Sequence, residues 1–112
     1  SLAIGKVKSA IQTDPKELIF FSNLQKIYQE MGEPYRFANE YKNLQLNNSK
    51  ELVWGYGKTL VRVIRQRAFG TYSKGNLDNA ILGFEDMLKI YKEIGDINGQ
   101  VPALFSLGLL NE

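Results

Sequence analysis

The 112 residues are enough for one domain with a continuous core, and the apolar and charged fractions of 44% and 23% are those of an ordinary globular protein. A formal net charge of +2 is too small to indicate a nucleic-acid or membrane partner. The chain has no cysteine and no histidine, which excludes disulfides, thiolate or histidine metal sites and histidine-dependent nucleophilic catalysis. We therefore expect no metal and no cofactor.

The chain carries no targeting or membrane signal that we can identify. No run approaches eighteen apolar residues, and the N-terminus lacks the basic-then-apolar pattern of a signal peptide. Together with the absence of cysteine, this predicts a cytoplasmic protein that does not contact a membrane. The first residue is Ser1 and not methionine, so we expect the chain to be a piece of a longer protein.

Apolar residues recur at three- and four-residue spacing along nearly the whole chain, while the alternation of a strand is missing, so we predict an all-α fold of about six helices. The first helix is expected from Leu2 to about Thr13. The second is expected to start at Pro15 and to run to about Met31, because Asp14 can act as its N-cap and Glu17 completes a capping-box spacing.

A third helix is predicted over residues 35–46, before Asn47-Asn48-Ser49 breaks the pattern and Ser49 provides an N-cap. Residues 50–74 then read as one long helix without proline. Gly55 and Gly57 leave two alternatives open there, a bend in that helix or a short separate helix before it.

The last part of the chain predicts two further helices. Gly75-Asn76 makes a turn in which Asn76 caps the next helix, which carries a wide apolar stripe from Leu77 to Tyr91. A final helix is expected to begin near Val101, where Pro102 is tolerated in a first turn, and to run to the end of the chain.

A helical pattern recurs about forty residues apart, and a period of 20–50 residues is typical of stacked arrays whose units bury their apolar faces against each other. The matching positions are Phe21, Leu24 and Tyr28, then Ile64, Ala68, Ala80 and Phe84, then Leu104, Leu107 and Gly108, with Ala10 and Pro15 closing a preceding unit. This order resembles the tetratricopeptide repeat, with its W-x2-L-G-x2-Y, A-x3-F and P signature, in its longer-helix variety.

The resemblance implies a right-handed superhelical array of antiparallel helix pairs, a TPR-like α-solenoid, in one domain over residues 1–112. It divides the chain into the end of one repeat (1–15), a second repeat (16–47), a third repeat (48–95) and the first helix of a fourth (96–112). Because these bounds start and stop within repeats, we expect a fragment of a longer array.

In the family that the chain resembles, the first helices of the repeats line a concave groove that holds a peptide or helix of a partner. The resemblance places nine residues in this predicted groove: Asn23, Lys26, Arg62, Arg65, Gln66, Phe69, Tyr72, Phe105 and Leu109. Asn23 falls where family members often hold an Asn that bonds the peptide backbone. Arg62 falls where peptide-clamping members place a Lys, whereas Gln66 stands where they carry an Arg.

The arginines Arg62, Arg65 and Arg67 also suggest an anionic ligand, because they lie within two turns of one helix and guanidinium groups bind carboxylate or phosphate through two hydrogen bonds. The alternative is a solvated helix face. Phe69 and Tyr72 could stack nucleic-acid bases, but the small net charge makes nucleic acid an unexpected partner.

Two functions follow from this sequence. The first is a noncatalytic scaffold that binds another protein or peptide, with an acidic partner as one alternative, since no residues form a nucleophile–base pair. The second is an architectural or oligomerisation segment of a larger signalling protein with no ligand of its own. The apolar residues of the last helix, among them Leu104 and Phe105, would then mediate self-association.

Overall fold

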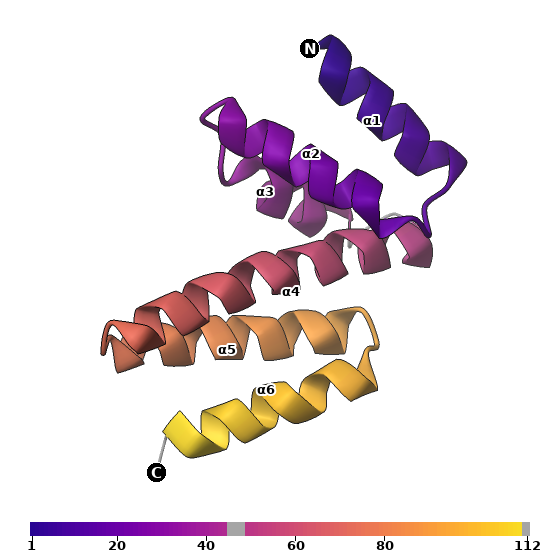
Figure 1. Ribbon diagram of the computed structural model, residues 1–112. Helices are drawn as coiled ribbons and strands as arrows, with labels where there is room; N and C mark the ends of the chain where they lie inside the picture. Colours follow the sequence, from indigo (N-terminus) through magenta and orange to yellow (C-terminus); the bar gives the residue numbers. More distant parts are fainter. Residues whose placement is uncertain (45–48, 111–112) are drawn as a thin grey trace. The chain divides into compact units, whose positions relative to one another are not determined.

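The computed structural model describes residues 1–44 and 49–110 (Figure 1). Within these residues the chain has no strand and forms six helices: α1 Leu2–Thr13, α2 Leu18–Glu30, α3 Arg36–Leu44, α4 Lys50–Ser73, α5 Leu77–Glu93 and α6 Ile97–Leu110. The predicted all-α class with about six helices is therefore confirmed. The superhelical arrangement and the repeat bounds stay predictions, and the expected end of the third helix at Leu46 lies outside the described residues.

The chain divides into two compact units, residues 1–60 and residues 61–112. The first unit holds α1, α2, α3 and the first half of α4, and the second holds the rest of α4 with α5 and α6. Helix α4 runs without interruption from Lys50 to Ser73, so the alternative of a short separate helix before Gly57 is wrong.

Aromatic side chains form the core of the first unit. Phe21 of α2 is fully buried and meets the Tyr56 ring edge-on at a centroid distance of 5.4 Å, while Phe37 of α3 lies 4.6 Å from the same ring. Gly55 faces Phe21 so closely that a Cβ atom at this position would overlap the phenyl ring. Close packing against Phe21 thus accounts for the glycine at this position.

In the second unit, α5 contacts α4 on one side and α6 on the other (Figure 1). Small residues let the helices approach closely: a Cβ atom on Gly83 of α5 would lie 2.9 Å from the Cβ of Ala68 on α4. Gly99 of α6 lies directly against the ring of Tyr91 on α5. Ala80 and Phe84, the predicted A-x3-F pair, are both buried on α5.

Two predicted helix caps are confirmed. The Ser49 hydroxyl accepts a hydrogen bond from the Leu52 N–H at 3.3 Å at the start of α4, and the Asn76 side chain accepts one from the Asn79 N–H at 3.4 Å at the start of α5. Both caps depend on residues three positions apart, which is why the local pattern identifies them.

Two predicted helix starts are wrong. Asp14 ends α1, and its carbonyl accepts from the Glu17 N–H at 3.2 Å, so a turn takes up the residues between them and α2 begins at Leu18 without a side-chain cap. Helix α6 begins at Ile97, four residues before the expected start, because the Asp96 carboxylate accepts from the Gly99 N–H at 3.0 Å.

Candidate functional site

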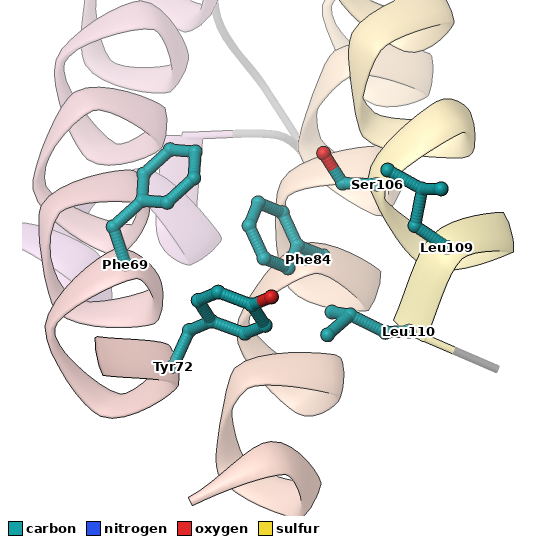
Figure 2. Close-up of a pocket in the computed structure, with 6 residues that line it drawn as sticks. All are labelled: Phe69, Tyr72, Phe84, Ser106, Leu109 and Leu110. Carbon is teal, nitrogen blue, oxygen red and sulfur yellow. The ribbon is translucent and has the colours of Figure 1, made fainter. Parts of the chain in front are cut away.

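An apolar pocket of about 190 Å³ opens in the second unit where three helices meet. Phe69 and Tyr72 of α4 form one wall, Ser106, Leu109 and Leu110 of α6 form the opposite wall, and Phe84 of α5 lies between them (Figure 2). The pocket exists because α4 and α6 both pack on α5, whose large side chains do not fill the space between its neighbours.

A second hollow of about 300 Å³ adjoins this pocket and shares Phe69, Phe84 and Ser106 with it. Its other lining residues are Arg65, Met87, Tyr91, Pro102 and Ala103. We refer to the two hollows together as the α4–α6 groove. Its lining is apolar apart from the Arg65 guanidinium and the hydroxyl groups of Tyr72, Tyr91 and Ser106.

The aromatic side chains of the groove are buried at its floor and exposed at its rim. The Phe69 and Phe84 rings meet edge-on, with centroids 5.4 Å apart, and Phe84 is only 3% exposed. In contrast, Phe69, Tyr72 and Leu109 remain 51%, 50% and 56% exposed. Covering such apolar surface is favourable by about 25 cal/mol per Å², so these residues gain by contact with a ligand.

A cation marks the other end of the groove. The Nη2 of Arg65 donates a hydrogen bond to the Tyr91 hydroxyl at 2.9 Å, which restrains the guanidinium while leaving its other donors available. Among the described residues, neither Arg62 nor Arg65 forms an ion pair with a carboxylate. Their positive charge is therefore not neutralised within this part of the chain.

The structure places four of the nine predicted site residues in the α4–α6 groove: Arg65, Phe69, Tyr72 and Leu109. Arg62, Gln66 and Phe105 are exposed but are not among the residues that line its two hollows. Asn23 and Lys26 are exposed on α2 in the first unit. A single groove that joins them to the other seven stays a prediction.

Six residues line the groove although the sequence pattern did not place them there: Phe84, Met87, Tyr91, Pro102, Ala103 and Leu110. Phe84 belongs to the regular apolar stripe of α5, and such a stripe predicts core without showing that one of its residues forms the floor of a pocket. No local signal separates Phe84 from its neighbour Ala80, which lines neither hollow, because the pocket is created by the distance between α4 and α6.

A second cluster of interacting side chains lies in the first unit around Glu40 of α3. It was not predicted from the sequence. One oxygen of the Glu40 carboxylate accepts from the Tyr28 hydroxyl at 2.6 Å and from the Lys8 ammonium at 2.9 Å, and the other accepts from the Tyr56 hydroxyl at 2.9 Å. The Arg36 Nε lies 3.6 Å away. The carboxylate thus joins side chains from α1, α2 and α4 to α3.

The protonation of this Glu40 cluster follows from its contacts. Burial disfavours the charged carboxylate, but the hydrogen bonds from Tyr28, Lys8 and Tyr56 outweigh it and hold the pKa of Glu40 below its usual value. Burial and the adjacent carboxylate raise the pKa values of Tyr28 and Tyr56 well above the usual one. Three side chains donate hydrogen bonds to this acceptor-only carboxylate, and the Arg36 guanidinium adds a nearby positive charge, so the cluster links α3 to three other helices.

Two kinds of site were not found among the described residues. No helix there combines the length and apolar character needed to cross a membrane. No group of three or more acidic residues in residues 1–44 and 49–110 is arranged to hold a metal ion.

Comparisons with protein-family models, with curated proteins and with solved structures gave no match to this chain.

Proposed function

We propose that this chain is a noncatalytic protein–protein interaction scaffold whose second unit binds a peptide or helix of a partner protein in the α4–α6 groove. The observation that carries the proposal is the aromatic pocket between α4 and α6, whose floor is buried and whose rim residues Phe69, Tyr72 and Leu109 are half exposed. A pocket of this kind suits one large apolar side chain of a partner.

Three physical arguments support a binding role. Aromatic residues dominate the energetics of protein interfaces because they offer a large contact area at low cost in side-chain entropy. Contiguous apolar surface on a monomer commonly marks a site of interaction. Finally, the groove lies on three helices that pack closely through Ala68, Gly83 and Gly99, so its walls are held in place before a ligand arrives.

We also propose that the six helices belong to a TPR-like superhelical array and that the protein acts in the cytoplasm. The array is supported by the buried pair Ala80 and Phe84 and by the close approach of α4 to α5 at Ala68. The absence of cysteine from the sequence supports the cytoplasmic setting.

The binding role is tested with peptides selected from a phage-displayed random library on the unaltered chain. We expect Tyr72→Ala to weaken the selected peptides about tenfold or more, because it removes half of one pocket wall. Leu82→Ala is the matched control, since Leu82 is equally exposed in the same unit but lies outside both hollows. Fluorescence polarisation measures the affinities, and circular dichroism checks that both variants fold.

Equal affinity of the selected peptides for the unaltered chain and for Tyr72→Ala would reject the α4–α6 groove as the binding site. A loss caused by Leu82→Ala alone would move the site to the outer face of α5.

A second candidate function is favoured by a separate observation. Helix α6 has no charged residue and exposes five large apolar side chains, of which the last also lines the groove: Ile97, Val101, Leu104, Phe105 and Leu109. Such exposed apolar side chains suit self-association, in which the chain supports the architecture of an assembly and needs no other ligand.

A further inference from the structure

The α4–α6 groove has a polarity along α4 that restricts what it can bind. Four residues, Arg62, Arg65, Phe69 and Tyr72, are spaced by three or four positions and therefore share one face of α4. The two cations lie towards the N-terminal side of this face, and the aromatic wall of the pocket lies towards its C-terminal side. A ligand that fills the pocket and continues towards the N-terminal end of α4 thus passes Arg65 first, and then Arg62, which lies on the same face of α4 beyond the lining of the two hollows.

The facing helix α6 contributes no negative charge that would neutralise the two arginines. Helix α6 carries no charged side chain, and no carboxylate is among the residues that line either hollow of the groove. Arg62 and Arg65 have no ion-pair partner within residues 1–44 and 49–110. The complementary ligand therefore has one bulky apolar group and negative charge to one side of it.

The spacing distinguishes an extended ligand from a helical one. With a rise of 1.5 Å per residue, Arg65 and Arg62 lie about 8 and 13 Å along the α4 axis from the midpoint between Phe69 and Tyr72. All four side chains tilt towards the helix N-terminus, so their relative offsets are kept. In an extended ligand, the residues whose side chains point the same way as the apolar residue in the pocket lie about 7 and 13 Å from it.

A helical ligand aligned with α4 fits less well. In a helical ligand, the residues on the same face as the apolar residue in the pocket are the third, fourth, seventh and eighth from it, at about 5, 6, 11 and 12 Å along the helix axis. Arg65, at about 8 Å, lies about 2 Å from the nearest of these positions and about 1 Å from the nearest position of an extended segment, so the extended register is the closer match.

We infer that the α4–α6 groove binds an extended acidic segment of a partner protein, in which one bulky apolar residue fills the pocket and carboxylates stand at the second and fourth positions to one side of it. The second position meets Arg65 and the fourth meets Arg62. This inference rests on the proposed function and adds to it the conformation and the charge pattern of the partner.

The test uses a set of capped synthetic peptides of one composition, each with a central Phe, two Glu and a Ser/Gly background, in which the two Glu occupy every pair of positions on either side of the Phe. We expect the tightest binding for the peptide with Glu at the second and fourth positions on one side of the Phe. Its sequence is either Phe-Ser-Glu-Ser-Glu or Glu-Ser-Glu-Ser-Phe, depending on the chain direction in the groove. Binding should be two- to fivefold weaker when one Glu moves by a single position.

Single substitutions then assign each carboxylate. In Arg65→Gln, a Glu at the second position should no longer raise the affinity, whereas a Glu at the fourth position still should. In Arg62→Gln, only the Glu at the second position should still raise the affinity. Arg67→Gln is the matched control, because Arg67 is an exposed arginine on the opposite side of α4 and should change neither preference. Added salt should weaken the best peptide and should affect both glutamine variants less.

The outcomes separate the inference from the proposed function. If the peptides bind, lose affinity in Tyr72→Ala, but show no dependence on the positions of Glu, then the groove is a binding site and the inferred charge pattern is wrong. If the tightest peptide has its Glu residues at the seventh and eighth positions from the Phe, then the ligand binds as a helix and not as an extended segment. If no peptide binds and no pocket resonance shifts in nuclear magnetic resonance spectra, both the inference and the proposed function are rejected.

Discussion

At the scale of single residues, Glu40 of α3 is the common acceptor of the Glu40 cluster. Its side chain is only 20% exposed and accepts hydrogen bonds from side chains of three other helices. Removing such a charge leaves buried hydroxyl donors without their strong acceptor, which costs more than the loss of an exposed ion pair.

We expect Glu40→Gln to lower the free energy of unfolding by about 2 kcal/mol, because an amide replaces a charged acceptor of several hydrogen bonds. Glu30→Gln is the control, since Glu30 is exposed at the end of α2, and it should change stability by less than about 0.5 kcal/mol. Urea titrations followed by circular dichroism measure both. Equal stability of the two variants would show that the Glu40 cluster does not hold the first unit together.

The Glu40 cluster also predicts how stability depends on pH. The lowered pKa of Glu40 in the folded state means that the unfolded chain takes up its proton first, so this stabilisation is complete above the unfolded value of about 4.3 and is lost as the pH falls through the lowered folded value. Unfolding measured at neutral pH and between pH 5 and 2 should show a steeper loss in the unaltered chain than in Glu40→Gln.

The two tyrosines act at the other end of the pH range. Their pKa values are raised in the folded state, so the unfolded chain loses these protons first, near pH 10, and stability falls as the pH rises beyond that value. Tyr28→Phe should reduce this alkaline loss, and an unchanged alkaline profile would contradict the bond from Tyr28 to Glu40.

At the scale of helices, the glycines of the second unit have different roles that a sequence pattern does not separate. Gly83 lies where α5 crosses α4, and Gly70 lies on an open surface of α4 with nothing within 4 Å of an added Cβ. Both stand inside helices, where glycine is unfavourable by about 1 kcal/mol relative to alanine. Only the first is required by packing.

We therefore expect Gly83→Ala and Gly70→Ala to have opposite effects. The new methyl group of Gly83→Ala would lie 2.9 Å from the Cβ of Ala68, which has no flexible side chain that could move away, so this variant should lose about 1–2 kcal/mol. Gly70→Ala should gain about 0.5–1 kcal/mol from helix propensity alone. Thermal unfolding compares the two, and a stabilised Gly83→Ala would contradict the close contact of α4 with α5.

At the scale of the whole molecule, the uncharged helix α6 decides between the two candidate functions. If its exposed apolar side chains mediate self-association, the sedimentation coefficient of the chain should rise with concentration, and Phe105→Glu should keep it low at every concentration. Leu82→Glu, on α5, is the matched control and should still associate. A sedimentation coefficient that does not depend on concentration would exclude the architectural alternative and leave the groove as the candidate site.

The sequence alone determined the helical class and the caps at Ser49 and Asn76, because these depend on residues a few positions apart. It also identified the face of α4 that carries Arg65, Phe69 and Tyr72, since helical periodicity places those side chains together without any other part of the chain.

Only the tertiary structure decided the rest. It placed Phe84 at the floor of the pocket and joined Glu40 to Lys8, which is 32 positions away in the sequence. The start of α6 is a different case: its Asp96 cap spans three residues and is as local as those at Ser49 and Asn76, but the prediction placed the start by Pro102 instead. The physical reason for the first two is the same: a pocket and a buried charge cluster are created by the spacing and orientation of packed helices, and no local pattern encodes the distance between two helices.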